Sequence, residues 1–372
     1  FGDGWTARSV SVDIPCGKGR QAVPVVIPGL QTRSLLNTFV HDLTTNPAVK
    51  TYHWEPEILM HQRSTAHPST QVYGEVWTSR RFRRMHKEVQ RLRKPGDDLP
   101  HCVLALMPGS DGTHLAQFGT ASAWPGYFDY GNRSKYVRAK RDAKTMQHCV
   151  SFPKLPDDIN DTLQRLGVTQ PSVKKEILTH LRRELNHAAW TRLLDDDFRQ
   201  AYQHGIVISC ADGVTRRVFP RFFCYIADYP EKMLIATLKD NGGCPCPRCL
   251  VKKGDIHHVG TPEDLEARRE NVRRHDGIWT RTVNAARSLI NKGITVFKSK
   301  RVTKLLKPKS WVPTKNAFEC LKEIHPTFSV FELFTPDLLL EIELGVWKNL
   351  LIHLLRILQA ADPRLLDILN ER

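Results

Sequence analysis

The stretch CVLALMPGSD, residues 102–111, decides the fold class of this chain. It is an apolar run that ends in an acid. Two further segments, THLAQFG (113–119) and SAWPGYFDYGN (122–132), follow it across Gly-containing turns, and the three together predict consecutive strands. A helical pattern over about 172–204 and another strand-like segment, VFPRFFCYIAD (218–228), come next. Strands interleaved with helices predict an α/β fold around one central mixed sheet with flanking helices.

Working outward from this stretch, we divide the chain into four segments. Residues 1–100 are interpreted as a strand-poor lead-in. Residues 101–239 form the first part of the core, 240–330 an insertion that contains a cysteine cluster, and 331–372 a C-terminal core helix. Because the chain starts without Met and stops within helical-looking sequence, we expect it to be a fragment of a longer protein.

Two helices are expected outside this central pattern. One is a basic helix over 79–94, whose non-apolar faces could follow a DNA backbone or simply be solvated. The other runs from about 337 to 359 and is expected to bury one apolar stripe. The residues of that stripe are Leu338, Ile342, Val346, Leu350 and Leu354.

The charge balance favours a polyanionic partner. Lys and Arg number 55 against 39 Asp and Glu, which gives a formal net charge of +16. A basic excess of this size attracts phosphate at long range, so nucleic acid is the expected partner. The nine cysteines in 372 residues do not resemble a secreted disulfide scaffold. The most apolar stretch, 344–358, contains charged residues, so no membrane span is expected.

Acidic residues stand at the ends of several predicted elements. Asp111 and Asp228 each end a strand, and Asp337 opens the last helix, with Glu341 and Glu343 close behind. Neighbouring strand ends could bring such carboxylates to one edge of a sheet. Their hard oxygen ligands suit Mg²⁺ or Mn²⁺ and two-metal phosphoryl chemistry. Each acid alone has a structural alternative, as a turn former or as a helix N-terminal residue.

A cysteine cluster opens the predicted insertion. Cys244, Cys246 and Cys249 include one CxxC spacing, which is typical of structural zinc sites. A fourth ligand would come from His257, or else from His258 or His275. A redox thiol pair and unligated cysteines stay open as alternatives.

The same segments resemble a known family. Five blocks stand in one order over most of the chain, from about residue 73 onward, and are similar to Plavaka transposases of fungi, a branch of the CACTA (CMC) group. The blocks are 110–138 (SDGTHLAQFG…), 176–232 (EILTHLRREL…ADYPEK), 244–250 (CPCPRCL), 312–318 (VPTKNAF) and 337–351 (DLLLEIELGVWKNLL).

This resemblance implies an RNase H-like fold with DDE/D chemistry. Asp111 would be the first catalytic acid and Asp228 the second, while the third would be Asp337, with Glu343 or Glu341 as the alternative. The implied activity is metal-dependent cleavage of DNA strands at transposon ends, followed by transfer of the 3′-hydroxyl into target DNA. Double-stranded DNA, a homo-oligomer when active, Mg²⁺ or Mn²⁺ and a nuclear location follow from it. The cysteine block resembles the cysteine motif that relatives carry after the second acid.

One position departs from the family pattern. Leu340 stands where relatives typically carry His. This favours an alternative in which the chain is a decayed or domesticated DNA-binding protein that keeps the fold without the chemistry. A third interpretation, an unrelated basic zinc-binding interaction module, would treat the five ordered blocks as chance.

Overall fold

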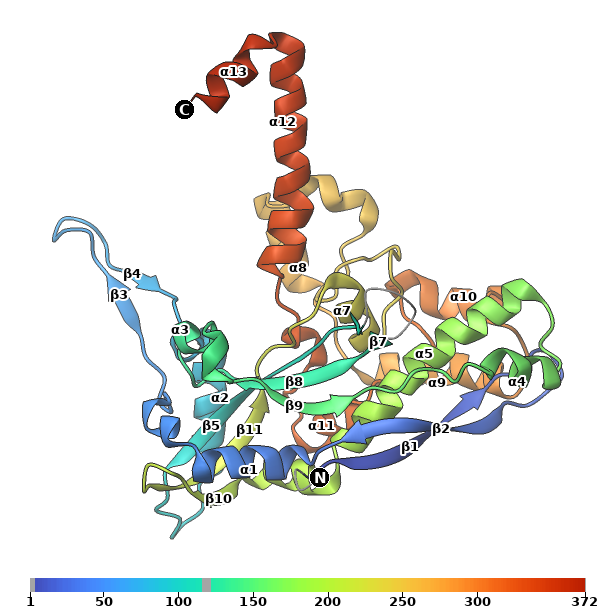
Figure 1. The fold of residues 1–372 in the computed structure, drawn as a ribbon, viewed down its shortest axis with the longest axis horizontal. Coiled ribbons are helices and arrows are strands. Elements are labelled where there is room, and N and C mark those ends of the chain that lie inside the picture. Colours follow the sequence, from blue (N-terminus) through green and yellow to red (C-terminus); the bar gives the residue numbers. More distant parts are fainter. Residues whose placement is uncertain (1–3, 116–121, 372) are drawn as a thin grey trace.

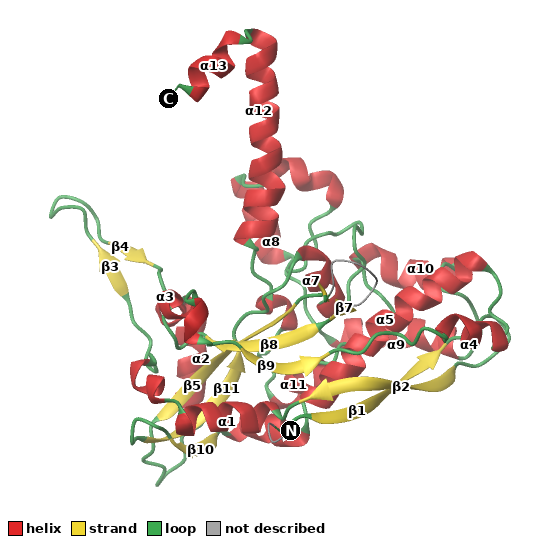
Figure 2. Ribbon diagram, in the orientation of Figure 1, coloured by secondary structure: helices red, strands yellow, loops and turns green. Residues whose placement is uncertain are grey.

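A mixed seven-stranded sheet organises the computed structural model, which describes residues 4–115 and 122–371 (Figures 1 and 2). The strand order is β1-β2-β9-β8-β5-β11-β10. Only the β5–β11 pair is parallel, and the other pairs are antiparallel. The strands are β1 (Thr6–Ile14), β2 (Val23–Thr32), β5 (His101–Ser110), β8 (Pro125–Tyr130), β9 (Gln147–Ser151), β10 (Ile206–Ser209) and β11 (Thr215–Phe222).

Helices cover the sheet, and two short hairpins lie outside it. The hairpins are β3 (Leu59–His61) with β4 (Thr70–Val72), and β6 (Thr113–His114) with β7 (Ser122–Ala123). The α-helices are α1 (Leu35–Thr45), α2 (Arg80–Gln90), α3 (Lys135–Arg138), α4 (Ile159–Arg165), α5 (Pro171–Leu193), α6 (Asp196–His204), α7 (Tyr229–Ile235), α8 (Pro262–Glu270), α9 (Gly277–Asn291), α10 (Lys300–Leu306), α11 (Glu319–Ile324), α12 (Lys348–Ala361) and α13 (Arg364–Asn370). Shorter helical turns are η1 (Pro47–Thr51), η2 (Val76–Thr78), η3 (Arg141–Ala143), η4 (Lys253–His258), η5 (Lys307–Lys309) and η6 (Val330–Leu333), and η7 (Leu338–Trp347) is a π-helix.

Strand β5 is buried along its whole length because both of its faces are covered. Successive side chains of a strand point to opposite faces of the sheet. Leu104 and Leu106 join the large core that includes α1, α5, α6 and α9, whereas Val103 and Ala105 pack in a smaller cluster with α2. The sheet is therefore sandwiched between two layers. This mixed α/β architecture confirms the predicted fold class and is consistent with an RNase H-like fold.

The predicted central elements are largely confirmed. Strands β5, β8 and β11 and helices α5 and α6 fall where the sequence predicts them. Of the strand predicted over 113–119, the described part contains the two-residue strand β6, and residues 116–119 lie outside the described residues.

Two expectations are wrong. The strand-poor lead-in contains β1 and β2, which extend the central sheet. The apolar stripe of the last helix is also not buried, since Leu338 is 68% exposed and Val346 64% exposed, and Ile342, Leu350 and Leu354 are exposed as well. The physical reason is visible in Figure 1, where α12 projects away from the body of the molecule. The first part of the predicted helix is moreover the π-helix η7.

The four-segment division of the chain stays a prediction. Within 240–330, Trp279, Val283 and Ile290 of α9 belong to the same large core as the sheet. Among the described helices, none is both long and apolar enough to span a bilayer.

Candidate active site at the ends of β5 and β11

The ends of the parallel strands β5 and β11 bring two predicted acids to one edge of the sheet. The pairing of β5 with β11 continues beyond β11 as a parallel bridge between Gly109 and Ile226, and the Ile226 amide donates to the Pro108 carbonyl at 2.8 Å. Asp111 and Asp228 each lie two residues beyond this bridge. Paired strands are about 4.8 Å apart, so the two acids leave the sheet from neighbouring positions on the same edge.

The two carboxylates have different local roles. Asp228 is the N-cap of α7, where its Oδ1 accepts a hydrogen bond of 3.0 Å from the Glu231 amide. Its backbone is thus fixed in the extended form that precedes a helix. Asp111 directly follows β5 and is exposed, and its amide donates to the Pro125 carbonyl at 3.4 Å. The sequence predicted both positions at strand ends, and Asp228 is in addition the first capping residue of a helix.

Glu231 is a third carboxyl group at this edge, and the sequence analysis missed it. Its side chain is buried and accepts hydrogen bonds from the Ser110 hydroxyl and, at 3.1 Å, from the Trp124 indole. Burial, together with the negative charges of Asp228 and Asp111, raises the pKa of Glu231 to about 8. The charges of both acids therefore act on one buried group. The spacing DYPE at 228–231 was the available signal, because it places a Glu on the first turn of α7.

Of the three third-acid candidates, one caps η7 and two lie within it. Phe334 forms a parallel bridge with Tyr225, which leads the chain back to the β11 side of the sheet. Asp337 is the N-cap of η7 and accepts from the Leu340 amide at 2.9 Å. Glu341 pairs with the ammonium of Lys232, a buried residue of α7. Glu343 is exposed.

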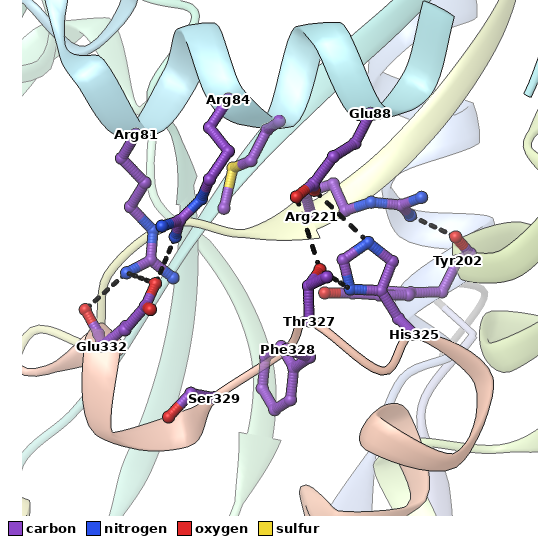
Figure 3. Close-up of a pocket in the computed structure, with 11 residues that line it drawn as sticks. Arg81, Arg84, Glu88, Tyr202, Arg221, His325, Thr327, Phe328, Ser329 and Glu332 are labelled. Carbon is purple, nitrogen blue, oxygen red and sulfur yellow. Dashed lines mark hydrogen bonds and ion pairs between the residues drawn. The ribbon is translucent and has the colours of Figure 1, made fainter. Parts of the chain in front are cut away.

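Helix α2 fixes the segment that leads to η7. Figure 3 shows Arg81 and Arg84 reaching Glu332, while Glu88 faces His325 on the same segment. The Arg81 Nη1 donates to the Glu332 carbonyl at 2.6 Å. A hydrogen bond from His325 lowers the pKa of Glu88, so this carboxylate is held in its charged form. A cavity of about 20 Å³ lies between these side chains. Through these contacts, the segment that precedes the third-acid candidates packs against α2, the helix that covers one face of β5.

The donor chemistry at the edge fits a hard divalent cation. Asp111 and Asp228 supply oxygen ligands of the kind that Mg²⁺ and Mn²⁺ take. Within residues 4–115 and 122–371, no group of three or more His, Cys, Asp or Glu side chains is arranged to hold a metal ion. The structure thus brings the first two predicted acids to one edge, and the third acid stays a prediction.

A known protein family matches most of this chain. The model of the Plavaka transposase family matches residues 30–355. The chain belongs to the Plavaka transposase family. No curated protein matches it. The matched range includes the acid pair, Glu231, the three third-acid candidates and the cysteine cluster, and it confirms the family that the sequence analysis identified.

The three cysteines of the cluster have different neighbours in this Plavaka transposase family member. The Cys249 thiol donates a hydrogen bond to Cys246, which lowers the pKa of Cys246 to about 5 and raises that of Cys249. Cys244 turns instead to the Pro308 carbonyl, with its Sγ 3.5 Å away. His257 is exposed and its ring lies against that of His258. Cys246 and Cys249 therefore interact with each other, while Cys244 and His257 have other neighbours, and the zinc site stays a prediction.

An arginine holds the cysteine loop together. Arg273 is buried and donates to the carbonyls of Cys244, Cys246 and Lys309, at 2.8, 2.8 and 2.7 Å. These charge-assisted bonds satisfy three backbone acceptors at once. His275, one of the alternative zinc ligands, is buried with its ring centroid 4.1 Å from that of Trp279, and burial lowers its pKa to about 3.

Proposed function

We propose that the chain is the catalytic core of a DNA transposase that cleaves DNA strands at transposon ends and transfers the freed 3′-hydroxyl into target DNA. The observation that carries this proposal is the register at the sheet edge, where Asp111 and Asp228 follow a paired Gly109 and Ile226. Membership of the Plavaka transposase family supports the DNA substrate. Asp111, Asp228 and one acid of η7 hold Mg²⁺ or Mn²⁺ in this proposal.

The residues at this edge have separable tasks. When bound, the metal would activate the attacking oxygen and stabilise the departing one. Asp228 is oriented by its capping bond to α7. Glu231 fixes the last residue of β5 against α7 through Ser110, so it sets the distance between the elements that carry the two acids. Basic side chains around the edge position phosphates and carry no sequence information.

The test is strand cleavage by the full-length protein on DNA that carries the element's own ends. Asp111→Asn and Asp228→Asn should each abolish cleavage in Mg²⁺ while DNA binding persists, because the substitution removes a charged metal ligand without changing the side-chain size. Asp161→Asn, on α4, is the matched control and should cleave normally. Cleavage that survives Asp111→Asn or proceeds in EDTA contradicts the proposal.

The alternative of a decayed DNA-binding protein rests on Leu340. This side chain is 46% exposed at the start of η7, where the family pattern has His. Wild-type protein that binds DNA but does not cleave it in Mg²⁺ or Mn²⁺ would favour this alternative. Restoration of cleavage by Leu340→His would assign the loss to that one position.

Two further proposals concern the assembly and the location of the protein. We propose a homo-oligomer as the active form, which the unpartnered apolar residues of α12 support; Leu350, Leu354 and Ile357 are 44%, 43% and 51% exposed. Sedimentation of the wild type tests the proposal, and a monomeric wild type counts against it. An oligomeric wild type whose mass Leu350→Glu/Leu354→Glu does not change would reject the role of α12. A nuclear location follows from a chromosomal DNA substrate and is tested by imaging a fluorescent fusion.

The zinc site is proposed as a structural one. Cys246 and Cys249 would supply two ligands, with Cys244 and His257 completing the set. Metal analysis of purified protein tests this, with Cys246→Ser as the variant that should lose the metal. A stoichiometry of zero in protein purified without chelator would reject it.

A further inference from the structure

Helix α2 carries a row of basic side chains along its solvent face. Arg80, Arg84, Lys87 and Arg91, the C-cap of the helix, follow the spacing i, i+4, i+7 and i+11, and all four are exposed. Residues at these spacings lie on one face of a helix. We call these four residues the basic stripe.

The opposite face of α2 attaches the helix firmly to the sheet. Phe82, Met85 and Val89 are buried against Val103, Ala105 and Phe219. At the two ends of the helix, the Arg81 Nη2 donates to the Phe222 carbonyl at 3.3 Å and the Gln90 Nε2 donates to the His101 carbonyl at 2.7 Å. The basic stripe is therefore presented on a fixed support and not on a mobile loop.

The positive charge of the stripe is largely uncompensated. Glu88 is the one acid of the helix, and it faces His325 in the interior contact that Figure 3 shows. Arg84 shares Glu332 with Arg81. Among the described residues, none forms an ion pair with Lys87 or Arg91, and Arg80 makes a neutral contact, from its Nε to the Tyr73 hydroxyl at 2.9 Å. A fixed row of cations, of which only Arg84 has an acidic partner among the described residues, favours a row of phosphates.

We propose that the basic stripe binds the sugar-phosphate backbone of duplex DNA that extends away from the acid pair. This inference rests on the proposed function, and it adds a surface and a direction to it. The proposed contact is to phosphates, which are the same in every base pair, so it is independent of base sequence.

The packing of α2 on the sheet sets the distance from the stripe to the acids. The helix runs antiparallel to β5, because Arg81 bonds to Phe222, the partner of Leu106, and Gln90 bonds to His101. Asp111 lies five residues beyond Leu106 and ten beyond His101, or about 17 and 33 Å at about 3.3 Å per residue. For a duplex that lies parallel to β5, at about 3.4 Å per base pair, the stripe contacts phosphates about 5–10 base pairs from the phosphate held at Asp111.

The salt dependence of DNA binding tests this proposal directly. Full-length wild type and Lys87→Gln/Arg91→Gln are titrated with a mixed-sequence duplex of about 40 base pairs, or four helical turns, at several salt concentrations. Each lost phosphate contact lowers the slope of log affinity against log salt by about 0.9, so the double variant should lose about 1.8 from the slope. The control is Lys175→Gln/Arg192→Gln on α5, which removes the same charges from exposed positions of a helix in the other layer.

The outcomes separate this proposal from the proposed function. An unchanged slope in the stripe variant, or an equal loss in the control, overturns the proposal for the stripe even where the wild type cleaves DNA. A lower salt slope in the stripe variant but not in the control supports the DNA-binding surface. If the wild type also binds DNA without cleaving it, the surface stands and the catalytic proposal is contradicted. Phosphate ethylation of a cleaved substrate adds a positional test: interference should occur about 5–10 base pairs from the cut and disappear in the stripe variant. Interference confined to the cut overturns the proposed direction of the DNA.

Discussion

Replacing Glu231 by Gln should change how the stability of the protein depends on pH. The pKa of this buried carboxyl is raised from 4.5 to about 8, first by burial and then by the charges of Asp228 and Asp111. The folded state therefore keeps a proton that the unfolded chain releases, and stability is lost as the pH rises from about 4.5 to about 8. A shift of one unit is worth about 1.36 kcal/mol, so ionisation of Glu231 costs the wild type about 4 kcal/mol between about pH 5 and pH 8.

The assay is equilibrium unfolding in denaturant at a series of pH values, with EDTA present so that no metal ion contributes. Gln keeps the size of the side chain but has no proton to release. The free energy of unfolding of Glu231→Gln, measured relative to wild type, should therefore rise by about 4 kcal/mol over this pH range. Glu263→Gln, on the exposed side of α8, is the control and should show a constant difference. A constant difference for Glu231→Gln as well would refute the reasoning.

Three further substitutions test the interior. Burial lowers the pKa of His187 to about 4, so the folded protein loses stability as the pH falls below 6.5. His187→Asn should remove about 2 kcal/mol of this loss between about pH 6.5 and pH 5. A urea midpoint that depends on pH in the same way in the variant and in the wild type would contradict this. Arg273→Met removes the donor from three carbonyls, one buried and two partly buried, and should cost about 3 kcal/mol in guanidinium unfolding, whereas the exposed neighbour Arg274→Met should cost little. A Cβ added at Gly126 would lie 2.4 Å from a side-chain carbon of the adjacent strand β9, so Gly126→Ala should lose about 1–3 kcal/mol by thermal unfolding. Gly243→Ala, where a Cβ meets nothing within 4 Å, is its control, and equal losses would reject the packing argument.

The sequence predicted the acid pair because the relevant signals are local. Asp111 follows a ten-residue apolar strand, and Asp228 follows an apolar segment and precedes Tyr-Pro-Glu, so each position is determined within a short stretch. What the sequence could not give is the parallel pairing of Gly109 with Ile226, which depends on contacts across more than a hundred residues.

Glu231 escaped prediction for the same reason. A glutamate on the first turn of a helix is ordinarily an exposed residue that favours the helix dipole. Its burial depends on Ser110 and Trp124, which approach from a different part of the chain. No local sequence pattern indicates that Ser110 and Trp124 contact Glu231.

The errors at the two ends of the chain have opposite causes. Pro24, Pro28 and Gly29 made β2 look irregular, yet most of β2 pairs only with β1, and a strand with one free side tolerates proline. In η7 and α12, an apolar periodicity was taken to mean burial. Periodicity identifies the apolar face of a helix, but it does not show that this face is covered: Leu350 and Leu354 are 44% and 43% exposed.

The choice among the three third-acid candidates can be made from what each carboxylate already does. Asp337 caps η7, and Asn caps as well as Asp, so Asp337→Asn should keep the fold. Glu341 neutralises the buried ammonium of Lys232, and removing one partner of such a pair leaves an unpaired charge, so Glu341→Gln should lower stability whether or not the residue binds metal. Glu343 is exposed, and Glu343→Gln should be structurally silent. Loss of cleavage at unchanged melting temperature in Asp337→Asn or Glu343→Gln therefore identifies the third acid. For Glu341, the decisive comparison is with Lys232→Met, which removes the ion pair but keeps the carboxylate: a cleavage defect in Glu341→Gln that Lys232→Met does not share assigns the chemistry to Glu341.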